Sequence, residues 1–126
     1  ALFMKNCLTV LSAFMINIPD DWDQLYLGGQ HRINPLKTDN PKVYRGLCVN
    51  RTHAYALRRK AFEQFYAHIN YAPDYFGKDN HHIDHQLELA HMRRDWNVYA
   101  PSVWIAGQSE GYSDICNEQL SERRWE

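Results

Sequence analysis

The sequence predicts a single domain of the α/β class, and three observations support this prediction. The length of 126 residues suits one compact domain. Apolar residues make up 44% of the chain and charged residues 23%, as in ordinary globular proteins. Segments with helical apolar spacing alternate with short runs of strand-forming residues. Their order is helix, three strands, two helices and two strands, so we expect a mixed sheet flanked by helices over residues 1–126.

The first third of the chain predicts a helix, a strand and a loop. Apolar residues at helical spacing predict a helix over residues 2–15, which Pro19-Asp20-Asp21 ends. Residues 22–27 predict a short strand that ends in a turn at Gly28-Gly29. Residues 30–42 are rich in Asn, Pro, Lys and Asp and predict a loop.

The middle of the chain predicts two strands and a helix. Residues 43–49 and 52–57 are the strand candidates, and Gly46 interrupts the first of them. Apolar residues recur at helical spacing over residues 60–69, and a loop containing Pro73 and Gly77 follows.

The last third begins with a helix that carries a cluster of histidines. Asp79 or Asn80 caps this helix, which runs to about Arg94. Two short strands, a turn-rich segment and a charged, loosely packed tail then follow in order, at residues 96–100, 103–106, 107–114 and 117–126.

Charge and cysteine content exclude several classes of function. The net charge of −1 offers no basic field for non-specific nucleic-acid binding. Three cysteines without a CxxC pair argue against a disulfide framework and against a zinc knuckle, which favours a reducing, cytoplasmic location. The longest apolar run, Cys7 to Ile18, contains polar residues and is shorter than the roughly 20 residues that span a bilayer. We therefore expect no transmembrane segment, although peripheral attachment to a membrane stays open.

The histidine helix separates apolar from polar residues when 100° is assigned to each position. Ile83, Leu87 and Ala90 fall together and are predicted to face the core. Polar residues fall together on the opposite side, namely His81, Asp84, His85 and Glu88.

Aspartate and histidine in this spacing suit general acid–base chemistry or metal ligation. Positions three and four apart on a helix lie within reach of one another, so Asp84 and His85 form a candidate site with His81 or His82. A solvated polar helix face is the plain structural alternative. The zinc-protease motif HExxH is absent, and no cysteine lies in the cluster, so a hydrolytic zinc site is not specified.

Three further segments are candidates for ligand binding. Gly28 and Gly29 would let a ligand approach the backbone closely, although a plain turn explains them too. Residues 51–55 place Thr52, His53 and Tyr55 on a strand, and residues 108–114 form a polar loop. The dinucleotide motif GxGxxG, a P-loop and the GxSxG elbow are all absent from the sequence.

These segments, taken in order, resemble glycosyltransferase family 25, the lipopolysaccharide and collagen sugar-transferase group. No single run is decisive, and the ordered set covers most of the chain. The matching runs are Pro19-Asp20-Asp21-Trp22-Asp23-Gln24-Leu25-Tyr26-Leu27-Gly28-Gly29, Thr52-His53-Ala54-Tyr55-Ala56, Ile83-Asp84-His85 within His81-His82-Ile83-Asp84-His85, Val98-Tyr99-Ala100-Pro101, and Gln108 with Ser113-Asp114-Ile115.

The resemblance implies a GT-A type α/β fold and transfer of a sugar, with inversion, from a nucleotide-sugar donor to a glycan or other hydroxyl. It also implies Mn²⁺ or Mg²⁺ as the cofactor. Asp84 would be the catalytic carboxylate, and His82 and His85 would orient it or contact phosphate. The substrate-binding residues would be Gly28, Gly29, Gln30, Thr52, His53, Tyr55, Gln108, Ser113 and Asp114.

One departure from the family pattern concerns the metal. The family carries an acidic, DxD-like run just before the helix that corresponds to residues 2–15, and the sequence begins at Ala1-Leu2-Phe3 without it. Asp20-Asp21 belongs to a later part of the pattern. The expectation is therefore a GT-A-like sheet that resembles the C-terminal half of a catalytic domain and lacks the N-terminal nucleotide-binding strands.

Two other hypotheses stay open at this point. One is a metal-binding module or metal-dependent hydrolase built on His81, Asp84 and His85. The other is a non-catalytic protein that binds a glycan or associates with itself, because a half-domain would expose a sheet edge and apolar surface.

Overall fold

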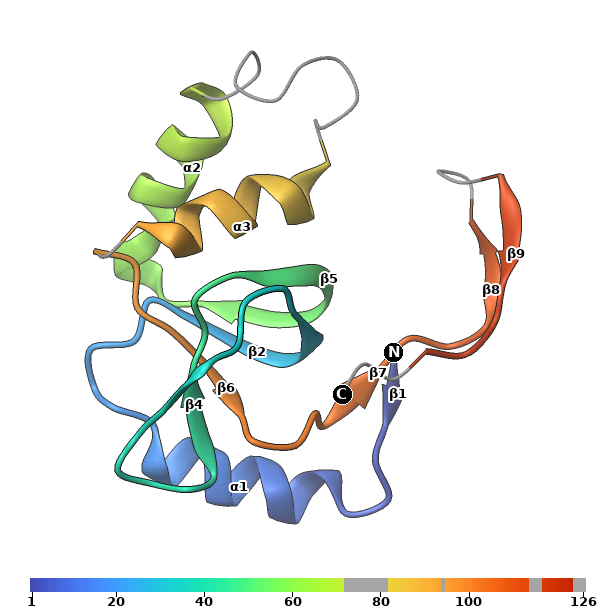
Figure 1. The fold of residues 1–126 in the computed structure, drawn as a ribbon, viewed down its shortest axis with the longest axis horizontal. Coiled ribbons are helices and arrows are strands. Elements are labelled where there is room, and N and C mark those ends of the chain that lie inside the picture. The colour runs from blue at the N-terminus through green and yellow to red at the C-terminus, as the bar shows by residue number, and fades with distance from the viewer. Residues whose placement is uncertain (72–81, 94, 114–116, 124–126) are drawn as a thin grey trace.

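The protein has a mixed α/β fold in which a five-stranded sheet lies between helices, as Figure 1 shows. This computed structural model describes residues 1–71, 82–93, 95–113 and 117–123. One helix lies below the sheet and two lie above it in the view of Figure 1, so the described chain has three layers. The α/β class predicted from the sequence is confirmed.

The central sheet mixes parallel and antiparallel strands in the order β3-β4-β6-β2-β5. The central strand β2 pairs in parallel with β6 and antiparallel with β5, and β4 pairs antiparallel with β6 and β3. The strands are β2 (Gln24–His31), β3 (Leu36–Lys37), β4 (Val43–Arg45), β5 (Val49–Leu57) and β6 (Val98–Pro101).

Alternation along β2 and β6 divides the core between the two faces of the sheet. On one face, Leu25 and Tyr99 join Phe14 of α1 (Cys7–Asn17) in one buried cluster. On the other face, Tyr26 and Val98 join a second cluster beneath α2 (Phe62–Tyr71) and α3 (Ile83–Met92). A short 3₁₀ turn, η1 (Arg59–Ala61), leads into α2.

Two small antiparallel pairs lie outside the main sheet. β1 (Leu2–Phe3) pairs with β7 (Ala106–Gly107) beside the end of β2. β8 (Gly111–Ser113) and β9 (Glu118–Leu120) form a hairpin that projects from the body of the molecule (Figure 1). A backbone bridge between Gln108 and Arg123 closes the base of this hairpin.

Several boundaries differ from the sequence prediction. The first helix begins at Cys7 rather than at residue 2, because Leu2–Phe3 pairs as a strand with β7. The predicted turn at Gly28-Gly29 is wrong, since β2 continues through both glycines and stays paired with β5. The two predicted strands at 43–49 and 52–57 are instead a short β4 and a long β5.

The C-terminal elements also differ in detail. The tail over residues 117–126 was predicted to be loosely packed, and its described part forms β9 and the bridge at Arg123. The third helix begins at Ile83 with His82 as its N-cap. The predicted caps Asp79 and Asn80 lie outside the described residues. In the described part of the chain, no helix combines the length and apolar character needed to cross a bilayer.

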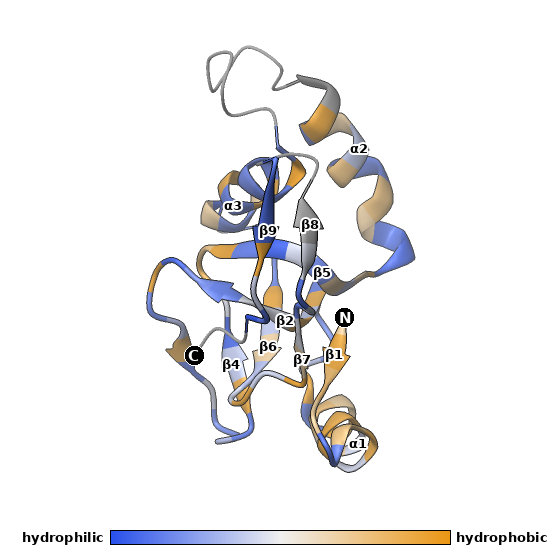
Figure 2. Ribbon diagram, turned by 90° about the vertical axis from the view of Figure 1, so that its right-hand side faces the viewer, coloured by the Kyte–Doolittle hydropathy of each residue, from blue (hydrophilic) through white to orange (hydrophobic). Residues whose placement is uncertain are grey.

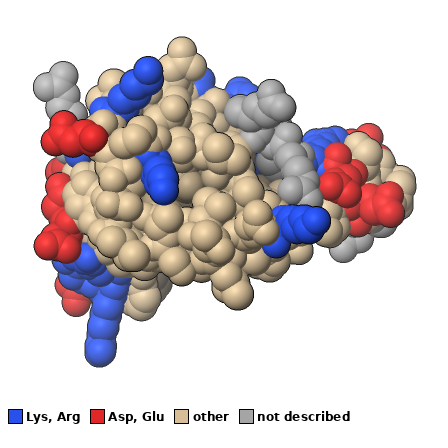
Figure 3. Space-filling view, turned by 90° about the horizontal axis from the view of Figure 1, so that it is seen from below, with Lys and Arg blue, Asp and Glu red and all other residues tan. Residues whose placement is uncertain are grey.

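Helix α1 carries no charged residue and is apolar on its outer side as well as its inner side. Figure 2 shows its mainly hydrophobic colouring. Leu8 and Ile16 are 75% and 81% exposed. The face seen from below is largely uncharged, with charged side chains gathered toward its margin (Figure 3). A helix that is apolar all round usually has protein or lipid on both sides.

A buried polar junction joins the upper helices to the sheet. The side-chain oxygen of Gln24 accepts hydrogen bonds from Trp96 Nε1 at 3.0 Å and from His91 Nε2 at 2.9 Å. The other ring nitrogen of His91 accepts the backbone N–H of Val49 at 3.1 Å. His91 is thus a neutral ring that donates on one side and accepts on the other, and burial lowers its pKa to about 3.

The low pKa of His91 predicts that stability falls in acid. The unfolded chain takes up this proton near the ordinary value of 6.5, whereas the folded chain takes it up only near pH 3. The stabilising contribution is therefore complete above about pH 6.5 and declines as the pH falls toward 3. We expect the melting temperature, followed by circular dichroism, to drop over this range.

The variant His91→Asn should show a smaller loss of melting temperature in acid, with a lower melting temperature at neutral pH. Some dependence of the melting temperature on pH should persist in this variant, because burial also lowers the pKa of His31 to about 4. His82→Gln changes an exposed ring and serves as the control. An acid slope in His91→Asn as steep as in the parent would contradict the assignment.

Candidate functional site

The glycine pair on β2 allows close contact between three segments. A Cβ atom at Gly28 would overlap the carbonyl oxygen of Ala106 and would lie 2.5 Å from His53 Nε2. In the folded chain His53 Nε2 lies 3.4 Å from that carbonyl, in position to donate to it. Burial, partly offset by this hydrogen bond, lowers the pKa of His53 below its ordinary value. Gly28 is therefore required for packing β5 and β7 against β2.

The pairing of β2 with β5 is irregular at this point. Its register shifts between Tyr26 and Gly28 and again between Gly28 and Gln30. Gly28 is opposite Ala54 and Gln30 is opposite Asn50, so residues 51–53 bulge from the ladder. Arg51 within this bulge has a φ of 81°, a strained conformation for a residue with a side chain. Such strain gathers at ligand sites.

Helix α3 and the residue after β2 bring a connected set of polar side chains together. Asp84 Oδ1 accepts the backbone N–H of His85 at 3.0 Å, and His85 Nδ1 lies 3.3 Å from Glu88 Oε2. The other carboxylate oxygen of Glu88 lies 3.7 Å from Arg32 Nε, just after β2. The rings of His82 and His85 are 6.0 Å apart.

The predicted faces of this helix are correct in part. Leu87 and Ala90 are buried, whereas Ile83 is 37% exposed. Asp84 and Glu88 are half-buried rather than solvent-facing. The reason is that the buried face of α3 includes His91, whose ring accepts a hydrogen bond from the sheet. Asp84 and Glu88 lie at the edge of this buried face.

Tyr26 connects the α3 carboxylates to β5. Its ring stacks on that of Tyr55, with centroids 5.9 Å apart. Burial raises the pKa of the Tyr26 hydroxyl well above its usual value, and the negative charges of Tyr55, Asp84 and Glu88 add to this effect. The structure thus places Tyr55 opposite Tyr26 and His53 against Gly28 along β2, and it places Asp84 and His85 on α3.

Other predicted residues lie elsewhere or are not described. Gln108 is half-buried and bonds through its backbone to Arg123. Ser113 lies on the projecting hairpin, opposite Glu118. His81 and Asp114 lie outside the described residues.

Five further residues lie near these groups; the sequence pattern had already placed Glu88 on the polar face of the helix, and it did not single out the other four. Glu88 had a signal, because it follows His85 by three positions on the helix. The other four become neighbours only through tertiary contacts; they are Tyr26, His31, Arg32 and Trp104.

No metal centre is assembled by the described residues, since no three His, Cys, Asp or Glu side chains come together among them. The hypothesis of a site on His81, Asp84 and His85 includes one residue outside this set.

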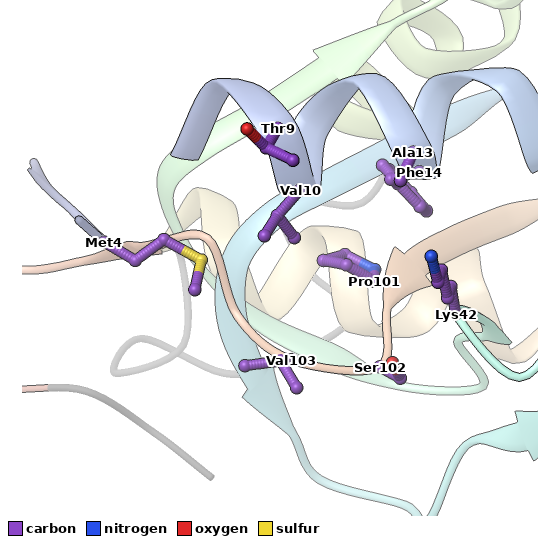
Figure 4. Close-up of a pocket in the computed structure, with 9 residues that line it drawn as sticks. All are labelled: Met4, Thr9, Val10, Ala13, Phe14, Lys42, Pro101, Ser102 and Val103. Atoms are coloured by element: carbon purple, nitrogen blue, oxygen red, sulfur yellow. The ribbon is translucent and has the colours of Figure 1, made fainter. Parts of the chain in front are cut away.

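An open apolar cavity of about 330 Å³ lies on the opposite side of the sheet, between α1 and the residues that follow β6 (Figure 4). Its polar groups are few and come from Thr9, Lys42 and Ser102. The remaining lining residues are Met4, Val10, Ala13, Phe14, Pro101 and Val103. This lining suits apolar contact rather than acid–base chemistry.

Comparisons with known proteins identify no relative of this chain. The chain matches no family model, no curated protein and no solved structure.

The crowding at Gly28 predicts that Gly28→Ala destabilises the fold. Overpacking of this kind costs about 1–3 kcal/mol, and the added methyl group would push His53 away from Ala106. Gly111→Ala is the matched control, because a Cβ atom there meets nothing within 4 Å. Urea unfolding of both variants measures the difference. Equal stability of the two would show that Gly28 is not held by these contacts.

Proposed function

We propose that this chain is a glycosyltransferase, or part of one, that resembles family 25 and transfers a sugar from a nucleotide-sugar to a hydroxyl group of a glycan. A GT-A type arrangement of the sheet is part of the same proposal. The mixed five-stranded sheet with helices on both faces is compatible with it.

The observation that supports the proposal is convergence. Two of the resembling runs contain Gly28 and His53. Ala106 lies two residues before Gln108, which belongs to a third run, and the three residues meet in one tight contact. The Tyr26–Tyr55 stack involves the strand residue two positions before Gly28, and the charge of Asp84 on α3 acts on the Tyr26 hydroxyl. Runs that are distant in sequence thus lie against one strand, β2, which is compatible with a shared substrate site.

Asp84 is the proposed catalytic base. Its carboxylate would accept the proton of the acceptor hydroxyl while that oxygen forms a bond to C1 of the donor sugar. The bond from C1 to the diphosphate oxygen breaks at the same time, and its electron pair leaves with the diphosphate. His85 adjoins Asp84, and its ring faces Glu88, so it would orient the acceptor beside the base. No step is assigned to a metal ion.

The first test is binding of UDP-glucose and UDP-galactose to the chain, observed by ligand NMR with and without Mn²⁺. We expect line broadening with the nucleotide-sugars and none with glucose-1-phosphate. Failure to bind in either condition would rule out activity of this chain by itself, although descent from the family would survive.

The second part of this test is the variant Asp84→Asn in an assay of UDP release with sugar acceptors. General base catalysis contributes about 10²–10⁴-fold, so we expect a loss in that range with nucleotide-sugar binding unchanged. Asp39→Asn, an exposed loop variant, is the control. Full transfer by Asp84→Asn would exclude Asp84 as the base.

A non-catalytic, self-associating protein is the second candidate, and the outer side of α1 favours it. Leu8 and Ile16 are the most exposed large apolar residues of this helix, and an apolar cavity adjoins the helix. Contiguous apolar surface of this kind marks interaction sites.

Light scattering separates the two candidates. If the chain is a self-associating protein, it elutes as an oligomer. Ile16→Lys then converts it to a monomer, because a charge cannot be buried between apolar faces. Tyr66→Lys, on an exposed position of α2, is the control. A monomeric parent chain would dismiss self-association through α1.

A further inference from the structure

A group of side chains near the candidate base has no assigned part in the transfer step. It consists of the Arg32–Glu88 ion pair, the neighbouring His85 and the stacked rings of His31 and Trp104. We call this group the β2–α3 rim. The rim lies on the α3 side of the sheet, because Trp104 packs against the cluster that contains Tyr26 and Val49.

The members of the rim's ion pair differ in their exposure to solvent. The Arg32 side chain is 58% exposed and that of His85 is 38% exposed, whereas that of Glu88 is only 15% exposed. Glu88 is therefore the more buried member of the group, and Arg32 and His85 are its more exposed neighbours. A ligand entering from solvent would meet charged hydrogen-bonding groups in a fixed arrangement.

The aromatic part of the rim is flat and uncharged. The rings of His31 and Trp104 stack with centroids 4.8 Å apart and planes inclined by 25°. Burial lowers the pKa of His31 to about 4, so the imidazole is neutral at physiological pH. Two stacked, half-buried rings offer apolar surface beside the polar ion pair.

Buried polar atoms at this end of the sheet lack hydrogen-bond partners among the described residues. They are Nδ1 of His31 and Oε1 of Glu88. Glu88 Oε1 faces Arg32 at 3.7 Å, which is beyond hydrogen-bond distance. Unsatisfied buried groups call for a water molecule or a ligand hydroxyl to complete them.

We propose that the β2–α3 rim is a binding subsite for the hydroxyl groups of an uncharged sugar, with Glu88 accepting one hydroxyl and Arg32 donating to another. The charges favour a neutral polyol over a phosphate, because Glu88 already balances Arg32. The identification of this sugar as the acceptor rests on the proposed glycosyl transfer. The proposal that the rim binds a sugar does not rest on the proposed glycosyl transfer.

The test uses the whole chain and two probes without a nucleotide, methyl α-D-glucoside and methyl α-D-galactoside. In ¹⁵N-labelled protein, at least one glycoside should shift the amide signals of Arg32, His85 and Glu88 in a saturable manner. A hydrogen bond to a charged group contributes about 1.5–3 kcal/mol, so Glu88→Gln should weaken binding by about tenfold or more.

Arg32→Met is the second variant, chosen because the Arg32 side chain is largely exposed and its loss should leave the fold intact. It should also weaken binding by about tenfold. Glu63→Gln, an exposed carboxylate on α2, is the matched control and should bind as the parent does. Should Glu88→Gln not fold, Arg32→Met decides the outcome.

The proposal is overturned if neither glycoside binds, if the shifted signals lie away from the rim, or if the rim variants bind as tightly as Glu63→Gln. Its failure is distinct from failure of the proposed transfer. If the chain binds a glycoside and no nucleotide-sugar, the proposed subsite stands and the proposed glycosyl transfer fails. If it binds a nucleotide-sugar and no glycoside, only the proposed subsite fails.

Discussion

The hydrogen bonds to the side-chain oxygen of Gln24 fix where the upper layer meets the sheet. Two donors converge on this one atom, from Trp96 ahead of β6 and from His91 near the end of α3. His91 is tied in turn to the backbone of Val49 at the start of β5. Because all these groups are buried, a shift of α3 by one residue would leave several polar groups unpaired, which costs far more than lost packing alone. The position of α3 is therefore specified by polar contacts as well as by its apolar face.

The candidate site depends on this junction. The carboxylates of α3 lie one to two turns before His91, on the flank of the helix that approaches Tyr26 and Arg32. Gln24 and Tyr26 alternate with Leu25 along the same strand, so β2 supplies the buried polar contact and an aromatic ring on one face, while Leu25 and Leu27 pack in the cluster that contains Phe14 of α1. The same few residues thus position the helix and complete the site.

Sequence reasoning predicted the class of the fold, the second helix and the buried side of the third, because these depend on local apolar spacing. It misplaced the turn at Gly28-Gly29, since glycine serves equally in turns and where backbones approach closely, and only the position of Ala106 decides between the two. It grouped His53 and Asp84 in one site through resemblance. Arg32 and Trp104 had no local signal, because their partners are brought to them by the fold of the whole sheet.

The irregular pairing between Gly28 and Gln30 has a consequence for how this chain tolerates change. Strand residues alternate between faces, so inserting or deleting one residue reverses every side chain beyond that point. The two register shifts set which residues of β2 and β5 face α3, and they hold His53 against Gly28. Substitutions along β2 can be absorbed singly by neighbouring side chains. A change in its length would exchange the residues that pack toward α3 with those that pack toward α1, so the number of residues in this segment is a stricter constraint than their identity.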